Sequence, residues 1–396
     1  MKITDVELIP VSTPLVVPFH MPGTEITHIH SIVIRITTDT GHVGIGDSGD
    51  TSTWYRGETP ESIAAIIEKH IAPRFLIGQN PLAIEKIVGE MDTFVRDNNQ
   101  AKALVDFALH DLKGKVAGLP VYELLGGKTT EGSRQGWVAG AGTEEFLVDQ
   151  ALLAIANGFS LVKIKSGGDE AQDVRNVKAV REAIGEDVRL VIDINGFWNY
   201  DQALHTIRKL DDYGLYCVEQ PLPHWDIEGL ARLRQRVGTP IFADESAQEL
   251  HHLKEIIDRR AADGLFIKLQ KAGGLVKAQR WLTMARLADL PVMSGCMIGS
   301  GLEASPSAHL MMSNQWASQF THENLGPLII NNQFENAEHR ITADIAQQVP
   351  VFKDGVLYAN EGPGYGIDLN EDFIAANGTL GGEVRHVRDE RARVLV

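Results

Sequence analysis

Acidic and basic residues stand at the ends of consecutive apolar segments in the middle of the chain, at nearly constant intervals. The segments are LVKIK with Lys163 and Lys165, RLVIDI with Asp193, YCVEQ with Glu219, PIFADE with Asp244 and GLFIKL with Lys268. Carboxylates flanked by ammonium groups suit a metal ion with proton donors and acceptors on either side. This combination is typical of chemistry at a carbon next to a carboxylate, where metal and lysines stabilise the enediolate and move the proton.

The two lysines of LVKIK are predicted to act together. Lys163 and Lys165 are separated by one residue, so both side chains point to the same face of a strand. Two adjacent ammonium groups disfavour each other's charge, and we expect the pKa of at least one to be lowered. A lysine tuned in this way can be a general base near neutral pH. The alternative is a pair of strand lysines that reach solvent, and the neighbouring acids favour catalysis.

The three acids predict a metal site. Asp193, Glu219 and Asp244 end successive strand-like segments, and neighbouring parallel strands lie roughly 4.8 Å apart. Three unpaired acids at one point would repel, and a divalent cation resolves that conflict. Oxygen-only ligands favour Mg²⁺, with Mn²⁺ as a substitute. Solvated surface acids or salt bridges are the alternative. Lys271, further on, is either a substrate contact or a surface lysine.

From Arg134 onward, strand-like and helix-like segments alternate strictly. The eight strands that we expect are QGWVAGA, LVKIK, RLVIDI, LYCVEQ, PIFADE, GLFIKL, PVMSGCM and ASQFTH. Such alternation predicts an α/β fold in which the strands close into a (β/α)-barrel of the modified TIM type. Functional residues of these barrels lie at the carboxyl ends of the strands, where the charged residues stand.

The chain is predicted to divide into three parts. Residues 1–128 contain a meander of strand-like segments followed by three helical segments, which is typical of an α+β capping domain. Residues 129–345 form the barrel that carries the catalytic groups. Residues 346–396 are too short to fold alone, and we expect this C-terminal segment to pack on the cap.

Composition limits the partners. The formal net charge of −16 over 396 residues argues against nucleic acid or an anionic membrane surface as a partner. No apolar run is long enough to cross a bilayer, and the first residues do not resemble a signal peptide. The two cysteines, Cys217 and Cys296, lie in apolar runs and are interpreted as buried thiols. We therefore expect a cytoplasmic protein. The strand-end acids and lysines further predict that its partner is a small-molecule carboxylate.

At these residues the chain resembles the enolase superfamily, specifically its muconate-lactonizing-enzyme subgroup. The resemblance covers nearly the whole chain. It is carried by AKALVDFALHDLKGK and GLPVYELLGG in the first part, by LVKIK, DIN, EQP, ADES and IKLQKAGG in the barrel, and by MIGSGLEASPSAHL, ENLGPL and PGYGI towards the end. Enzymes of this superfamily are known to use Lys or His bases with Mg²⁺ and an enediolate intermediate.

The resemblance implies a role for each matching residue. Lys165 would be the acid/base on one face of the substrate, Lys163 its electrostatic partner, and Lys268 the second acid/base or a cationic stabiliser on the other face. Glu323 stands where muconate cycloisomerases have an assisting acid. The Mg²⁺ ligands would be Asp193, Glu219 and Asp244. Loops of the cap near residues 20–28 and 49–55 would select the substrate, and the expected contacts are His20, Trp54, Tyr55, Asn195 and Met297.

The resemblance implies an isomerase and leaves several activities open. A muconate cycloisomerase-like enzyme is the first prediction, because HENLGPLII is similar to the corresponding stretch of those enzymes. A racemase or epimerase of N-acylated amino acids or dipeptides is the alternative, although dipeptide epimerases usually carry a second acid where this chain has Leu325. A syn-dehydrating lyase of the o-succinylbenzoate synthase type and a non-catalytic barrel are further alternatives. We also expect the chain to form a homo-oligomer.

Overall fold

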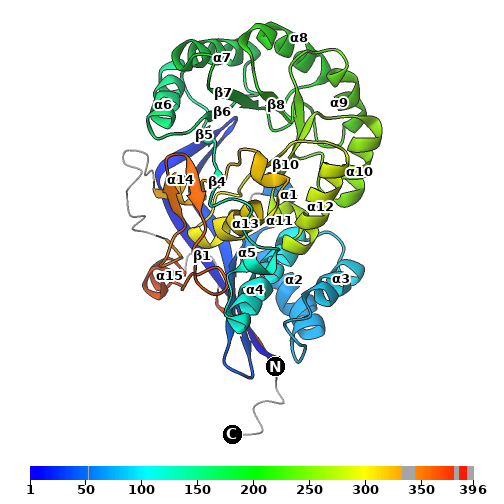
Figure 1. Cartoon of the computed structure of the whole chain (residues 1–396), viewed down its shortest axis with the longest axis vertical. Helices are drawn as coiled ribbons and strands as arrows, with labels where there is room; N and C mark the ends of the chain where they lie inside the picture. The colour runs from blue at the N-terminus through cyan, green and yellow to red at the C-terminus, as the bar shows by residue number, and fades with distance from the viewer. Residues whose placement is uncertain (52, 332–343, 379–382, 390–396) are drawn as a thin grey trace.

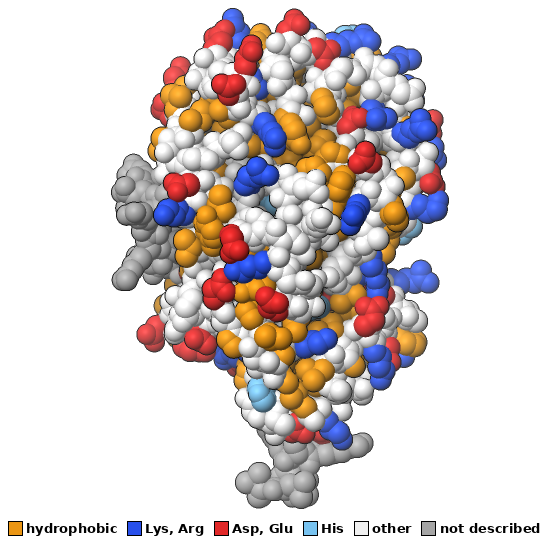
Figure 2. Space-filling model, in the orientation of Figure 1, with side chains coloured by type: hydrophobic (Ala, Val, Ile, Leu, Met, Phe, Trp, Pro, Cys, Tyr) orange, Lys and Arg blue, Asp and Glu red, His pale blue; other side chains and the backbone are white. Residues whose placement is uncertain are grey.

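The computed structural model describes residues 1–51, 53–331, 344–378 and 383–389. A ring of strands surrounded by helices occupies one end of the molecule, and an antiparallel sheet with its own helices occupies the other (Figure 1). Acidic, basic and apolar side chains are mixed over the face seen in Figure 2, with no large area of one sign. None of the described helices is long and apolar enough to span a membrane.

The cap is built on a four-stranded antiparallel sheet in the order β14-β1-β2-β3. Its strands are β1 (Ile3–Met21), β2 (Thr24–Thr38), β3 (Val43–Asp47) and β14 (Arg385–Arg388). Two long strands, β1 and β2, form a hairpin that turns at Gly23, whose φ of 77° is readily adopted only by glycine. This hairpin reaches from the cap to the mouth of the barrel.

Helices cover one face of the cap sheet. They are α1 (Thr53–Arg56), α2 (Pro60–Ile66), the π-helix η1 (Ile67–Leu76), α3 (Ile84–Phe94), α4 (Asn99–Ala117) and α5 (Val121–Leu124). Most of α4 is buried, because one side packs on β2 and β3 while another contacts α11 and α12 of the barrel. This helix ends at Gly118, whose φ of 69° is the left-handed conformation that glycine commonly adopts at a helix C-terminus.

The contact between β3 and α4 leaves no room for a side chain at Gly44. A Cβ there would overlap the carbonyl oxygen of Ala108 and lie 2.6 Å from Leu112 Cβ. We expect Gly44→Ala to lower the free energy of unfolding by about 1–3 kcal/mol, the usual cost of overpacking, as measured by urea denaturation. Gly89→Ala in α3 is the control, because a Cβ at Gly89 meets nothing within 4 Å. Equal effects of the two substitutions would contradict the prediction.

The second part is a barrel of parallel strands, ordered β11-β10-β9-β8-β7-β6-β5 in the sheet. The strands are β5 (Trp137–Ala139), β6 (Leu161–Lys165), β7 (Arg189–Asp193), β8 (Cys217–Glu219), β9 (Ile241–Ala243), β10 (Gly264–Ile267) and β11 (Val292–Ser294). Together with the antiparallel cap, this sheet confirms the predicted modified TIM barrel.

Helices follow the strands and form the outer ring (Figure 1). They are α6 (Glu144–Ala156), α7 (Glu170–Ile184), α8 (Tyr200–Leu210), α9 (Ile227–Arg234), α10 (Leu250–Arg259), α11 (Leu269–Ala272), α12 (Leu275–Leu287), α13 (Gly301–Ser313) and α14 (Gly326–Asn331). Side chains of Thr143, Asp169, Asn199, Asp226 and Ser300 cap the first turns of α6, α7, α8, α9 and α13, respectively. These caps satisfy amide groups that a helix leaves without intrahelical partners.

The prediction of an eighth strand at ASQFTH is wrong. Ala317–Gln319 form a short 3₁₀ helix, whose first amide donates to the side chain of Asn314. Only single parallel bridges remain, between Gln135 and His322 and between Gly295 and Glu323. The segment still reaches both edges of the sheet, so Glu323 stands at the barrel mouth without a strand to carry it. Likewise, the predicted strand PVMSGCM ends at Ser294, before Cys296.

The C-terminal part contacts both the cap and the barrel. A hairpin of β12 (Val351–Lys353) and β13 (Val356–Tyr358) pairs with β4 (Ser133–Arg134), just before the first barrel strand. Helix α15 (Glu371–Asn377) contacts β1 of the cap, and β14 adds an edge strand to the cap sheet. The division of the chain at residues 128 and 345 stays a prediction.

Candidate active site

An apolar cluster inside the barrel supports the charged residues at its mouth. The cluster comprises Leu161, Val191, Cys217, Phe242, Phe266 and Met293, one from each of the strands β6 to β11. Side chains alternate between the two faces of a strand, so a residue two positions further along also points inward. Those positions are Lys163, Asp193, Glu219, Asp244 and Lys268, with Gly295 on the last strand. Strand geometry alone therefore gathers the predicted site residues at one end of the barrel.

Lys163 lies among three carboxylates. Its Nζ donates to Glu219 over 2.7 Å, forms a closer ion pair with Glu323, and lies 3.6 Å from Asp193. Burial lowers the pKa of Lys163, but the charges of Glu219, Glu323 and Asp193 outweigh burial and hold that pKa well above its usual value. The prediction was that at least one lysine of the pair has a lowered pKa, and Lys163 is not that lysine, because acids from β7, β8 and the segment at Glu323 surround it.

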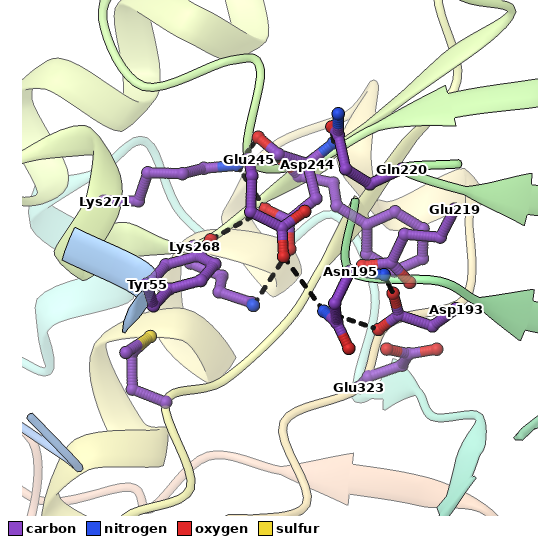
Figure 3. Close-up of polar contacts among 12 residues, drawn as sticks. Tyr55, Asp193, Asn195, Glu219, Gln220, Asp244, Glu245, Lys268, Lys271 and Glu323 are labelled. Carbon is purple, nitrogen blue, oxygen red and sulfur yellow. Dashed lines mark hydrogen bonds and ion pairs between the residues drawn. The ribbon is translucent and has the colours of Figure 1, made fainter. Parts of the chain in front are cut away.

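Lys165, at the end of β6, pairs with the next strand. Its Nζ donates to Asp193 Oδ2 over 2.6 Å and to Asn195 Oδ1 over 3.2 Å. Asn195 has a left-handed backbone, with φ of 48°, and its amide group also donates to Glu245 Oε1 over 2.9 Å. Figure 3 shows Asn195 between Asp193 and Glu245. Asn195 therefore links the two strand ends that hold these acids.

Lys268 and Lys271 both pair with Asp244. Lys268 Nζ lies 2.9 Å from Asp244 Oδ2. The side chain of Lys271 has no exposed surface, and its Nζ donates to the carbonyl oxygens of Asp244 and Phe266 over 2.7 and 2.9 Å and to Asp244 Oδ1 over 2.5 Å. Burial raises the pKa of Asp244, but the two lysines outweigh burial and hold that pKa well below its usual value. The sequence suggested that Lys271 is either a substrate contact or a surface lysine. It is neither, because it is fully buried and does not line the cavity.

The cap contributes Tyr55 to this cluster. Tyr55 lies in α1, and its hydroxyl donates to Asp244 Oδ1 over 2.7 Å, while Lys268 Nζ lies 4.1 Å from the centre of its ring. Figure 3 shows Tyr55, Lys268 and Lys271 converging on Asp244. The neighbouring Arg56 makes a separate contact with Gln248 Oε1, over 2.9 Å. Two residues of α1 thus form hydrogen bonds with the barrel, and one of their partners, Asp244, is a predicted metal ligand.

We expect Tyr55→Phe to weaken the binding of Mg²⁺ several-fold. The substitution removes the hydrogen bond that helps to orient the Asp244 carboxylate, and losing such support costs 10- to 100-fold in known metal sites. Equilibrium titration with Mg²⁺, or with Mn²⁺ followed by electron paramagnetic resonance, measures the change. Arg56→Ala is the matched control, because it removes the hydrogen bond between the same helix and Gln248 but leaves the contact with Asp244 in place. A similar loss of affinity in both variants would assign the effect to the position of the helix.

The charged residues open onto a cavity of about 80 Å³ between cap and barrel. Its polar lining consists of Asp50, Tyr55, Lys163, Lys165, Asn195, Lys268 and Glu323. Its apolar lining consists of Phe19, Met21 and Ile26 from the cap hairpin and of Val138, Met297, Ile298 and Ile329 from the barrel, with Gly295 and Cys296 beside them. A ligand in this cavity would meet both lysine ammonium groups and apolar side chains.

The predicted substrate contacts divide into two groups. Tyr55, Asn195 and Met297 line the cavity. The side chain of His20 is 49% exposed, lies 3.8 Å from Glu25 and does not line the cavity. His20 lies on the face of β1 that points away from the cavity, which is lined by its neighbours Phe19 and Met21. The side chain of Trp54 lies outside the described part of the chain.

Two cavity residues beside His20 could have been predicted from the sequence. In PFHM, the apolar Phe19 and Met21 alternate with the polar His20, which is the pattern of a strand with one buried face.

The sequence indicates the buried position of Glu245 only weakly, because Glu245 directly follows Asp244 and could have been an ordinary surface acid. Burial and the nearby charges of Asp244 and Asp193 raise the pKa of Glu245 to about 7.

The predicted metal ligands are adjacent, and each is paired with lysine. Asp193 and Glu219 are direct partners in the register of β7 and β8, and Asp244 follows the end of β9. Within residues 1–51, 53–331, 344–378 and 383–389, no three acidic, His or Cys side chains by themselves form a ready metal cluster. The lysine ammonium groups lie between the carboxylates instead.

The donor chemistry of these carboxylates nonetheless fits a hard divalent cation. All three ligands would supply oxygen, which Mg²⁺ prefers. Glu219 Oε1 is buried and has no hydrogen-bond partner among the described residues. Burial and the charge of Asp193 also raise the pKa of Glu219 well above its usual value. Such an oxygen is costly to bury unpaired, and a cation held by Asp193, Glu219 and Asp244 would satisfy it.

Comparison with known proteins places this geometry in a family. Residues 3–126 match the family described as mandelate racemase/muconate lactonizing enzyme, N-terminal domain, and residues 147–373 match the family described as enolase C-terminal domain-like. An N-succinyl-L-Arg/Lys racemase of Bacillus cereus is 32% identical over 94% of this chain and 97% of its own. Muconate cycloisomerase 1 of Rhodococcus opacus is 30% identical over 94% of this chain and 98% of its own.

Solved structures agree with these matches. The crystal structure of a mandelate racemase/muconate lactonizing family protein from Azoarcus sp. EbN1 has a TM-score of 0.92 and 56% identity, and covers 98% of this chain and 100% of its own. That of N-succinyl Arg/Lys racemase from Bacillus cereus has a TM-score of 0.90 and 31% identity, and covers 98% and 100%. The resemblance seen in the strand-end motifs is thus confirmed, and the chain belongs to the mandelate racemase/muconate lactonizing enzyme family of the enolase superfamily.

Proposed function

We propose that this protein is a Mg²⁺-dependent isomerase that racemises or epimerises the carbon next to a carboxylate. One observation carries the proposal: two lysines, Lys165 and Lys268, reach the same cavity from β6 and from the end of β10. Three strands separate β6 from β10 in the sheet, so the two ammonium groups approach a ligand from different walls. Moving a proton from one face of a carbon to the other requires two such groups.

Asp193, Glu219 and Asp244 would hold the Mg²⁺. When bound, the ion neutralises the negative charge that develops on the substrate carboxylate as the α-proton leaves. Lys163 adds a fixed positive charge beside these acids, since it already pairs with Glu219 and Glu323. The apolar wall of the cavity excludes water and so strengthens these electrostatic interactions.

Lys165 and Lys268 would exchange roles between the two directions of the reaction. In one direction the neutral amine of Lys165 removes the α-proton, and the ammonium group of Lys268 returns a proton to the opposite face. In the reverse direction Lys268 is the base and Lys165 the acid. Asn195 and Asp193 orient Lys165, while Asp244 and the ring of Tyr55 orient Lys268. A general acid or base placed in this way contributes about 10²–10⁴-fold to the rate.

The lining of the cavity favours a substrate with a single carboxylate. Its three lysines, Lys163, Lys165 and Lys268, are already paired with Glu219, Asp193 and Asp244, respectively. No arginine among the described residues lines the cavity. A second carboxylate, such as that of a muconate, would face Asp50, Glu323 or the apolar wall. An N-acylated amino acid or a dipeptide derivative, with an uncharged and largely apolar remainder, suits these surroundings better.

A muconate cycloisomerase-like activity is the second candidate. It is favoured by Glu323, which is ion-paired with Lys163 at the place of the assisting acid in such enzymes. Lys165 would then protonate the enolate formed when one carboxylate adds across a double bond, and Lys268 would only stabilise charge. A syn-dehydrating lyase would use the same first proton removal and then expel hydroxide.

Proton NMR in deuterated water with Mg²⁺ distinguishes these activities. The substrates would be N-acylated amino acids, dipeptides, hydroxy acids and cis,cis-muconate, each assayed separately. Deuterium entering the α-position of both enantiomers, with no other net conversion, is the result expected for the proposed racemase or epimerase. Formation of a lactone from muconate without α-exchange of the amino acid derivatives would establish the second candidate. New ultraviolet absorption with loss of water would indicate a lyase.

A further inference from the structure

A groove on the outer surface of the cap has the character of a second ligand site. It has a volume of about 430 Å³ and lies between the π-helix η1 and the segment that follows α3. Its lining residues are Ile66, Lys69, His70, Pro73, Arg74, Phe75, Phe94, Val95, Arg96 and Asn98. None of them lines the active-site cavity, and Figure 1 shows α2 and α3 at the end of the molecule away from α7 and α8.

The groove is lined by basic residues in an acidic protein. Lys69, Arg74 and Arg96 line it together with His70, and none of the acidic residues that the structure describes lines it. The chain as a whole carries a formal net charge of −16. Within the described residues, none of these four side chains makes an ion pair. A local cluster of unpaired cations against an opposite overall charge is an anion-attracting feature.

Two acidic residues near the groove are already paired with other cations, whereas Asp97, between the lining residues Arg96 and Asn98, makes no ion pair among the described residues and does not line the groove. Glu68, in η1, pairs with Arg385 at the edge of the cap sheet over 3.1 Å. Asp92, in α3, pairs with Lys102 and Lys277 over 3.0 and 3.3 Å. Neither acid lines the groove. The positive charge of the groove is therefore not neutralised by these two acids.

Aromatic rings hold one arginine in place. The guanidinium carbon of Arg74 lies 3.9 Å from the centre of the Phe94 ring and 5.2 Å from that of Phe75, and the two rings stack at 6.0 Å. The ring of Phe94 is itself partly open to solvent, since Phe94 is 56% exposed. A guanidinium group stacked on a ring keeps its N–H groups free for an oxyanion, which it can bind with two parallel hydrogen bonds.

The π-helix brings two cations to the same side. In a π-helix the amide of one residue bonds the carbonyl of the residue five positions earlier, as Ile77 does with Ala72 at the end of η1. Lys69 and Arg74 are five positions apart and both line the groove. Arg96 faces them from the segment after α3. π-helical geometry is rare, and the single-turn bulges in which it mostly occurs are frequently found at functional sites.

We propose that this groove binds a small polyanion, a molecule that carries at least two phosphate or carboxylate groups. A single oxyanion would engage Arg74 and one neighbouring cation, and the volume of the groove leaves room for a second group at Arg96. The site is separate from the proposed racemase chemistry, and it stands or falls independently of that function.

Isothermal titration calorimetry on the full chain tests the proposal. The probes are inorganic pyrophosphate, citrate and, as the single-group comparison, acetate, at constant ionic strength and constant free Mg²⁺. Citrate is expected to bind measurably tighter than acetate, and the affinity is expected to fall as salt increases. Stronger binding of pyrophosphate than of citrate would identify a phosphorylated ligand, and the reverse order a polycarboxylate. No binding of either at millimolar concentration would overturn the proposal.

Variants locate any binding that is observed. Arg74→Gln and Arg96→Gln are each expected to weaken it several-fold, and the double variant at least tenfold. Because Arg74→Gln also removes the contact with Phe94, Lys69→Gln provides a variant without that structural effect. Arg286→Gln, at an exposed arginine of α12 on the barrel, is the matched control and should bind as the unaltered protein does. Binding that is unchanged in Arg74→Gln, Arg96→Gln and Lys69→Gln would place the anion elsewhere and refute the site.

Discussion

Lys165→Met and Lys268→Met are each expected to abolish racemisation while leaving α-hydrogen exchange in one enantiomer only. Each lysine serves one face of the substrate, so the enzyme that keeps the other lysine can still remove and return a proton on that face. Turnover between enantiomers should fall by about 10²–10⁴-fold or more in each variant, the usual contribution of a general acid or base. Proton NMR of each pure enantiomer in deuterated water measures both quantities.

The pattern of exchange separates the two candidate functions. Complementary enantiomer selectivity of the two variants is the result that two opposed bases require. Full racemisation by Lys268→Met would contradict the proposal and would leave Lys165 as the one proton carrier, as the cycloisomerase candidate requires. Mg²⁺ affinity must be measured for both variants, because Lys165 pairs with Asp193 and Lys268 with Asp244. A loss of exchange that merely follows a loss of Mg²⁺ would say nothing about the bases.

The substitution Lys271→Met is expected to lower the free energy of unfolding by about 3 kcal/mol, the typical cost of removing one partner from a buried ion pair. Lys271 has no exposed surface, and its ammonium group is bound to three oxygens of Asp244 and Phe266. Burial lowers the pKa of Lys271, although the charge of Asp244 acts in the opposite direction. Methionine fills a similar volume but leaves those oxygens without their donor. Urea denaturation in the absence of Mg²⁺ measures the loss.

Two comparisons make this result interpretable. Lys254→Met removes an exposed lysine that pairs with Asp258 within α10, and such surface pairs contribute about 0–1 kcal/mol. Added Mg²⁺ should recover part of the stability lost in Lys271→Met, because a cation bound to Asp244 replaces some of the missing charge and stabilises only the folded protein. An effect of Lys271→Met as small as that of Lys254→Met would show that Lys271 is not a necessary support of the site.

Several expectations remain open to experiment. The assignment of Lys163, Lys165, Lys268 and Glu323 to catalysis stays a prediction, as does that of Asp193, Glu219 and Asp244 to Mg²⁺. The homo-oligomer and the division of the chain into three parts also stay predictions. Each has a direct measurement, from the variants above to light scattering and limited proteolysis.

The sequence by itself determined the barrel and the positions of its charged residues. Strand, helix and strand follow one another locally, and side chains alternate along a strand with a period of two. Asp193, Glu219 and Asp244 could therefore be assigned to one end of the barrel before the strands were seen. The same alternation in the cap segment PFHM assigns Phe19 and Met21, and not His20, to the buried face of the strand.

Only the tertiary structure decided which groups from distant segments meet. Tyr55 reaches Asp244 although the two residues are 189 positions apart, and Lys271 turns inward although its place beside Gly273 equally suits a surface lysine. The pKa of Lys163 is raised because acids from other segments of the chain surround it, which the spacing of Lys163 and Lys165 could not reveal. Periodicity is a local property of the chain, whereas ion pairing and pKa depend on through-space distances that the packing of the whole fold sets.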